Sequence, residues 1–156
     1  DIAFFTSFFE GIDREVILSG KFDGTVADFK TNNLRLKLDR NTEFFGNLAM
    51  VGLPYTDNTT FDMLIKKFIT TESEINNIDI PPFTSRKKLK LPKELAGIGV
   101  IDIKGKMKGK FDDFLADVNL ITSEGTVNLD TRYWEEGRNT NLKGKIIAQK
   151  LNIDLC

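Results

Sequence analysis

A glycine-rich phrase that occurs twice constrains the fold of this chain more than any other feature. Residues 20–29 (GKFDGTVADF) return as residues 105–114 (GKMKGKFDDF), with a second glycine four positions after the first and Asp-Phe at the end. Residues two apart share one face of a β-strand, so Gly20, Phe22 and Gly24 are expected to lie together. Glycine weakens a flat strand but permits a sharp bend or the close approach of another group. The repeat therefore predicts a long, curved, repetitive sheet rather than a compact enzyme.

Charge and residue types exclude several classes of function. The 156 residues suffice for one domain with a sizeable core. The 22 basic and 23 acidic residues balance, so we expect no nucleic-acid partner. Histidine, the commonest general base and metal ligand, is absent, and the only cysteine is Cys156. An intrachain disulfide and a Cys-rich zinc site are thereby excluded, and we expect no catalytic residues, no metal site and no cofactor.

Alternation of apolar and polar residues predicts a meander of about eight strands, mostly antiparallel, with little helix. The clearest strand is the second, where Leu34, Leu36 and Leu38 alternate with Arg35 and Lys37. The expected strands are 16–26, 34–38, 43–51, 61–65, a run from 98 through the second phrase to 120, 127–133 and 151–155.

Turn and helix signals separate these strands. Residues 39–41 and 123–125 are typical turn sequences. Thr71 or Ser73 is expected to cap one helical turn that continues to Ile78. A short amphipathic helix is expected over residues 2–9, a loop with a basic cluster after residues 81–82, and a polar loop over 135–141.

Nearly every expected strand is apolar on one face, and that face must be covered. A closed sandwich or barrel would cover it with the chain's own side chains. A sheet curled into a trough would instead leave an apolar interior for a ligand. The alternation of residues is compatible with both arrangements.

The order and spacing of several phrases carry a resemblance to a known family. The phrases lie at residues 16–26 (VILSGKFDGTV), 33–36, 41–42, 46–48, 52–54, 103–109 (IKGKMKG), 113–116 and 122–127. Together they resemble a segment of the TamB family of translocation-and-assembly proteins, which are related to the AsmA-like proteins of Gram-negative envelopes. The version in Bacteroides-type bacteria is the most similar, and the resemblance runs from about residue 2 to residue 155.

The resemblance implies a fold, a location and a function. The fold is a β-taco, a long curved antiparallel sheet that forms a half-open trough with a hydrophobic interior and one or two short helices. We therefore expect residues 1–156 to be one β-taco segment excised from a much longer protein, with approximate repeats at 16–78 and 98–155. The family implies a periplasmic bridge, anchored in the inner membrane, that conducts phospholipids to the outer membrane. It also implies support for outer-membrane protein assembly with a TamA-type partner, and no catalytic residues.

Phospholipid acyl chains are thus the expected ligand. The residues expected to line the lipid groove are Leu18, Phe22, Val26, Leu34, Leu36, Leu38, Leu48, Met50, Phe61, Met63, Ile65, Ile101, Ile103, Met107, Phe111, Val118, Leu120, Val127, Leu129, Leu151 and Ile153. Several of them, including Phe22 and Leu120, are expected to face an open trough. Exposed end strands and apolar surface also predict self-association of the chain.

Other groups have simpler explanations. Asp112 and Asp113 could form a carboxylate pair, but neighbours in a strand point to opposite faces, so a solvated turn is expected. The basic run from Arg86 to Lys93 could contact lipid headgroups or form a solvated loop. Two further functions stay open: a structural or adhesive β-sandwich module of an envelope protein with a closed core, and a β-rich enzyme.

Overall fold

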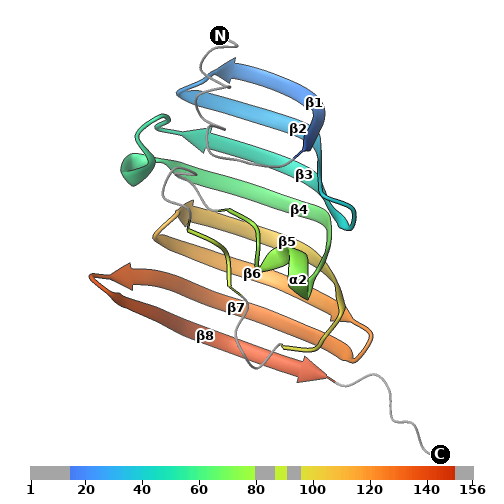
Figure 1. Ribbon diagram of the computed structural model, residues 1–156. Helices are drawn as coiled ribbons and strands as arrows, with labels where there is room; N and C mark the ends of the chain where they lie inside the picture. The colour runs from blue at the N-terminus through green and yellow to red at the C-terminus, as the bar shows by residue number, and fades with distance from the viewer. Residues whose placement is uncertain (1–14, 80–86, 91–95, 150–156) are drawn as a thin grey trace, which may run out of the picture.

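A single antiparallel sheet contains most of the regular structure (Figure 1). The computed structural model describes residues 15–79, 87–90 and 96–149. The strands are β1 (Val16–Thr25), β2 (Asp28–Leu38), β3 (Thr42–Val51), β4 (Thr60–Thr71), β5 (Val100–Lys110), β6 (Asp113–Thr122), β7 (Gly125–Glu136) and β8 (Asn139–Gln149). Their order in the sheet is their order in the chain, so the eight strands form a meander. Among the described strands, β1 and β8 are the two edges, and the sheet is open rather than closed into a barrel. The predicted fold class is confirmed.

Two short helical turns accompany the sheet. The 3-10 turn η1 (Thr56–Asn58) follows β3, and α2 (Glu72–Ile75) follows β4. The predicted cap is Thr71, whose hydroxyl accepts a hydrogen bond of 3.2 Å from the Glu74 amide. Within the described ranges, no helix is long and apolar enough to span a membrane.

The segment between β4 and β5 crosses one face of the sheet. We call its described parts, residues 72–79, 87–90 and 96–99, the strap. Figure 1 shows α2 and the strap in front of the sheet. Its Ile98 packs against the core, and its Ile75 is buried. The strap is also tied to itself, because the Leu89 amide donates to the Ile78 carbonyl at 2.8 Å.

The two glycine phrases occupy equivalent places in two hairpins. Gly24 pairs with Phe29 across the β1–β2 hairpin, and Gly109 pairs with Phe114 across the β5–β6 hairpin. The predicted single run from 98 to 120 is therefore wrong. The chain reverses direction at Phe111, between β5 and β6. The alternation of apolar and polar residues continues through this turn, so the sequence pattern does not reveal it.

Other sequence-based boundaries also need correction. The predicted polar loop over 135–141 is a tight turn at residues 137–138 between β7 and β8. Edge strand β8 begins with three polar residues, so no apolar period marks its start. The strand 61–65 extends through Thr71. The predicted helix at 2–9 and strand at 151–155 lie outside the described residues.

Candidate functional site

The apolar face of the sheet is built from rows of residues that lie directly opposite one another on neighbouring strands. One row contains Leu18, Leu36, Phe44, Phe68, Ile103, Leu120, Val127 and Ala148. The next contains Leu34, Gly46, Ile65, Gly105, Val118, Leu129 and Ile146. We call the face that carries these rows the inner face. Rows of this kind are the unit in which side chains stabilise a sheet.

Two more rows continue the inner face toward the β1–β2 and β5–β6 turns. One contains Phe22, Thr31, Leu48, Met63, Met107, Ala116, Thr131 and Gly144. The other contains Gly24, Phe29, Met50, Phe61, Gly109, Phe114, Tyr133 and Leu142. Apolar residues and glycines fill both rows apart from two threonines and one tyrosine.

The structure brings the predicted lining residues together on this face. Leu38 and Ile101 lie at its far end, beside Thr42 and Thr70. Val26 and Phe111 lie in hairpin turns, although the Phe111 ring stacks on Phe61 at 5.7 Å. Leu151 and Ile153 lie outside the described residues. The other predicted residues occupy the four rows.

The inner face is filled at its centre and exposed at its sides. Ile65, Ile101, Val118 and Leu120 form a buried cluster. Leu120 is only 4% exposed, so the expectation that it faces an open trough is wrong. The cluster is buried because strap residue Ile98 and partly buried neighbours pack against it.

At the edges the same rows remain in solvent. On β1, Leu18 is 38% and Phe22 is 45% exposed. On β8, Leu142 and Ile146 are each 57% exposed. The sides of the trough therefore present apolar surface that the described parts of the chain leave exposed.

A polar network closes the end of the inner face at α2. Glu74 accepts a hydrogen bond of 2.8 Å from the Asn41 side chain and one of 2.5 Å from the Thr42 hydroxyl. The Thr42 and Thr70 hydroxyls lie 2.8 Å apart and are buried. Burying these polar atoms is tolerated because they are hydrogen-bonded to one another.

Aromatic rings line the opposite end. Phe61 lies 6.1 Å from Phe114, and Phe114 stacks on Tyr133 at 4.8 Å. The Tyr133 hydroxyl donates to Glu135 at 2.8 Å, and the other Glu135 oxygen lies 3.5 Å from the Lys87 ammonium of the strap. Burial raises the pKa of the Tyr133 phenol, and the hydrogen bond and charge of Glu135 raise it further. The strap is thus tied to β7 at this end.

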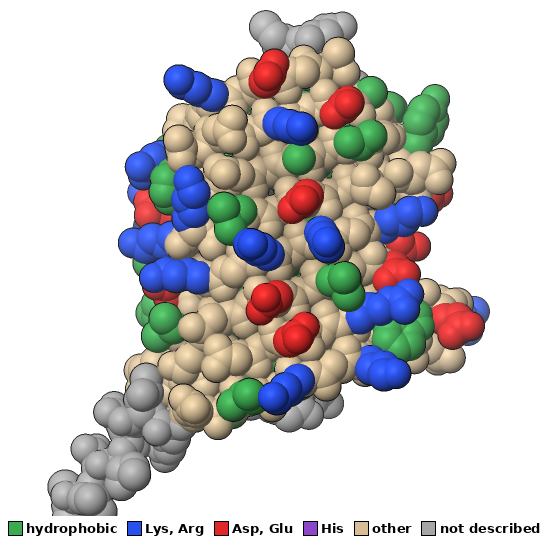
Figure 2. Space-filling model, turned by 180° about the vertical axis from the view of Figure 1, so that it is seen from behind, with side chains coloured by type: hydrophobic (Ala, Val, Ile, Leu, Met, Phe, Trp, Pro, Cys, Tyr) green, Lys and Arg blue, Asp and Glu red, His purple; other side chains and the backbone are tan. Residues whose placement is uncertain are grey.

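The outer face is polar. Figure 2 shows basic and acidic side chains interspersed over the side turned away from the strap. Lys106, Asp117, Asp130 and Lys145 form one row of opposite residues across β5 to β8. This face is a solvated surface without a concentration of one charge.

Asp112 and Asp113 do not form a shared acid site. Asp112 lies in the turn, and Asp113 accepts two hydrogen bonds from the Arg132 guanidinium, at 2.9 and 2.8 Å. These hydrogen bonds lower the pKa of the Asp113 carboxyl and raise the pKa of Arg132. The expected solvated turn is observed, with Asp113 in a structural ion pair.

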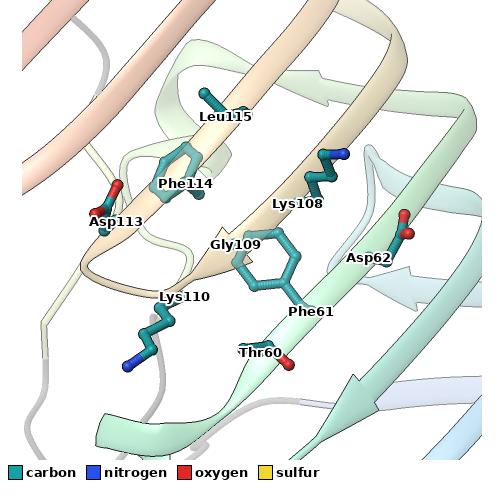
Figure 3. A pocket seen from close by; sticks show the side chains of 9 residues that line it. All are labelled: Thr60, Phe61, Asp62, Lys108, Gly109, Lys110, Asp113, Phe114 and Leu115. Carbon is teal, nitrogen blue, oxygen red and sulfur yellow. The ribbon is translucent and has the colours of Figure 1, made fainter.

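A shallow depression of about 450 Å³ lies beside Gly109 (Figure 3). Its lining residues are Thr60, Phe61, Asp62, Lys108, Gly109, Lys110, Asp113, Phe114 and Leu115. By register, the charged side chains among them belong to the outer face. Lys108 and Lys110 project on either side of Gly109 in Figure 3 rather than toward one point. The depression therefore brings together no acid and base around a common reacting atom.

Several inner-face residues escaped the sequence analysis: Phe29, Phe44, Phe68, Phe114, Tyr133, Leu142 and Ile146. Phe68 is turned inward by a register shift between β3 and β4, where Gly46 pairs with Ile65 but Phe45 pairs with Lys67. Phe29 and Phe114 are the second residues of β2 and β6, and they are the last residues of the two glycine phrases. The Asp-Phe ending that both phrases share was the signal that could have found them.

The inner face offers apolar side chains rather than a cluster of reactive groups. In the part of the chain that the structure describes, no group of histidine, cysteine or acidic residues is arranged to hold a metal ion. Two described lysines of the basic run contact other side chains: the Lys87 ammonium lies 3.5 Å from Glu135, and Lys88 donates a hydrogen bond of 3.2 Å to Asn77.

No protein-family model, curated protein or solved structure matches the chain.

Proposed function

We propose that the inner face binds phospholipid acyl chains. We further propose that the chain is a segment of a TamB-type bridge in the periplasm, which passes lipids between the two membranes or supports outer-membrane protein assembly with a TamA-type partner. One observation carries this proposal: mainly apolar rows cross one face of an open sheet, and their side chains on β1 and β8 are exposed. The envelope location, the membrane anchor of the parent protein and the partner follow from the sequence resemblance.

The energetics of lipid transfer favour such a surface. Each CH₂ group removed from water contributes about 0.8 kcal/mol, so a chain of about fourteen carbons resists transfer through water by on the order of 10 kcal/mol. An exposed apolar surface offsets most of that cost for the part of the chain that lies against it. Uniform aliphatic and aromatic contacts also let a chain slide, whereas a specific polar pocket would hold it in one place.

Three buried threonine hydroxyls of the inner face are hydrogen-bonded within the protein. The Thr31 hydroxyl donates to the Leu48 carbonyl at 3.1 Å, and the Thr42 and Thr70 hydroxyls bond to each other. These groups do not form a headgroup site. The proposed acyl-chain surface lies on the β1–β2 and β7–β8 sides, where inner-face side chains are exposed, and the strap occupies the middle.

A second function has one observation in its favour. Ile101 is 0% exposed within a cluster that the chain fills by itself. A structural or adhesive module of an envelope protein would need such a dry core and no ligand. The two functions differ in what covers the exposed sides of the inner face.

Lipid binding can be tested with two matched variants. Leu18→Asp with Leu142→Asp places charges on the inner face of the two edge strands. Ile17→Asp with Ile147→Asp places the same charges on the outer face of the same strands. All four side chains are exposed, so both variants are expected to fold. Each protein is incubated with liposomes, repurified and analysed by native mass spectrometry with lipid extraction.

The proposal predicts bound phospholipid on the unsubstituted chain and on the outer-face variant, and loss of most of it on the inner-face variant. A lipid-free unsubstituted chain, or equal lipid on both variants, would overturn the proposal. Circular dichroism checks that both variants keep the β-sheet spectrum.

A further inference from the structure

Both edge strands of the sheet are long. β1 has ten residues and β8 has eleven, and each has one paired neighbour among the described strands. Neither contains proline, and no charged side chain on either strand points to the inner face. Proline and inward-pointing charges are two of the devices that keep sheet edges from pairing. The lysines of both edges lie on the outer face, and the β1–β2 register shifts between Ser19 and Lys21. On the inner face, the described part of the chain therefore leaves both edges open to another strand.

Inside the sheet, glycine stands opposite a larger residue. Gly24 pairs with Phe29, Gly105 with Val118 and Gly109 with Phe114. The same relation holds at Gly144, which pairs with Thr131. A missing side chain on one strand is filled from the neighbouring strand, and the inner face stays continuous.

Large and small residues also alternate along the inner face of both edge strands. The inner-face residues of β1 include Leu18, Gly20, Phe22 and Gly24, and those of β8 include Leu142, Gly144, Ile146 and Ala148. We propose that β8 of one copy of this chain pairs antiparallel with β1 of a second copy, with Ile146 opposite Gly20. This register also places Leu142 opposite Gly24, Gly144 opposite Phe22 and Ala148 opposite Leu18, so every pair joins a small and a large residue.

The direction of the strands permits this pairing. Because the sheet has eight strands and each runs antiparallel to its neighbour, the last strand, β8, runs opposite to the first, β1. A second copy in the same orientation therefore presents its β1 antiparallel to β8, with its inner face on the same side. The contact is head-to-tail and leaves an edge free at each end, so it forms open chains of copies. It continues the inner face across the seam, and it is independent of whether that face binds lipid.

Symmetric pairings of two identical edges can also join small and large residues. Two β8 strands that meet at Lys145 place Gly144 opposite Ile146, and two β1 strands that meet at Lys21 place Gly20 opposite Phe22. Each of these pairings sets a lysine directly opposite its own copy, and neither contains a pair of opposite charges on the outer face.

On the outer face, the proposed seam contains one attractive and one repulsive pair. Lys143 lies opposite Asp23, and Lys145 lies opposite Lys21. Like charges directly opposite one another are destabilising, so association is expected to depend on concentration. Lys21→Glu makes the second pair attractive and should lower the dissociation constant on the order of threefold. In a β1–β1 pairing that meets at Lys21, the same change replaces one like-charge pair with another and would not strengthen the contact.

The register is tested by disulfide cross-linking. In a Cys156→Ser background, Asp23→Cys with Lys143→Cys places thiols opposite each other, within the distance that a disulfide spans. Mild oxidation should give a ladder of oligomers on a non-reducing gel. The control, Ser19→Cys with Lys143→Cys, shifts one thiol by four residues, about 13 Å along the strand, and should give no ladder.

Sedimentation velocity supplies a second measurement. Ile146→Lys puts a charge on the inner face of β8 and should abolish association, whereas the neighbouring change Ile147→Lys should not. A chain that stays monomeric at all concentrations would overturn the proposal. So would cross-linking of the control pair, or dimers formed by a single-cysteine variant in place of the ladder.

Discussion

Gly105 of β5 lies so close to Val118 of β6 that a Cβ atom on Gly105 would stand 2.7 Å from the Val118 Cα. The neighbouring atoms belong to the backbone, so no rotamer change could relieve the contact. Gly105 also has a φ of +144°, which L-residues rarely adopt. Gly20 stands in the same relation to Leu34 in the first hairpin, where the corresponding distance is 3.0 Å. The repeated glycine phrase is thus a device for close strand approach.

Gly105→Ala is expected to lower the free energy of unfolding by about 1–3 kcal/mol, because strain and a backbone clash act together. Urea denaturation followed by circular dichroism measures the change. Gly137→Ala is the control: its φ is +62°, but nothing lies within 4 Å of the added atom. It should cost less, and equal costs would contradict a role for close approach.

Leu120→Ala is expected to destabilise the protein by about 2–5 kcal/mol, because it opens a cavity in the buried cluster. Its neighbour Ile121 lies on the outer face and is 37% exposed, so Ile121→Ala should change stability by about 0.5 kcal/mol. Urea midpoints of the two variants give the comparison. A reversed order would mean that the two faces of β6 are assigned wrongly.

Glu74→Ala is expected to lower the free energy of unfolding by about 1–3 kcal/mol, because it leaves the buried Thr42 hydroxyl without the carboxylate. Hydrogen exchange over residues 72–78 should also become faster, since α2 loses its attachment to Asn41. Ser73→Ala changes an exposed residue of the same helix and should leave both quantities unchanged. Unchanged exchange in Glu74→Ala would show that the carboxylate does not hold the strap.

The Tyr133 phenol is expected to ionise above the ordinary tyrosine pKa, because burial and Glu135 disfavour the phenolate. In a Tyr55→Phe background, ultraviolet absorbance follows Tyr133 alone. Glu135→Gln should lower this pKa but leave it raised, since burial is the larger cause. An unchanged pKa in Glu135→Gln would contradict the contact between the two side chains.

The raised pKa of Tyr133 also predicts in which direction the stability of the protein changes with pH. A raised pKa means that the folded state favours the neutral phenol. The stabilisation is therefore fully present below the ordinary tyrosine pKa and is lost as pH rises through the higher folded-state pKa. Tyr133→Phe should remove this alkaline loss.

Local sequence predicted the faces of most strands because alternation in a strand depends only on the chain itself. Leu34, Leu36 and Leu38 all lie on the inner face, as their spacing predicts. The alternation failed at Phe44 and Phe45, which are adjacent and both aromatic. Phe44 faces inward, and Phe45 faces outward beneath the Arg35 guanidinium, 4.5 Å from its ring centroid. Sequence spacing cannot distinguish the two, because the pairing partners decide which one is buried.

The sequence by itself determined an antiparallel meander with one apolar face and glycines that allow it to curve, because glycine placement and period-two alternation are local properties. Tertiary structure alone decided that the described sheet is open and how much of its apolar face stays exposed. Strap residue Ile98 reaches the core from outside the strands, and the register shift in β4 turns Phe68 inward. Both depend on contacts between residues far apart in the chain, which no local pattern encodes.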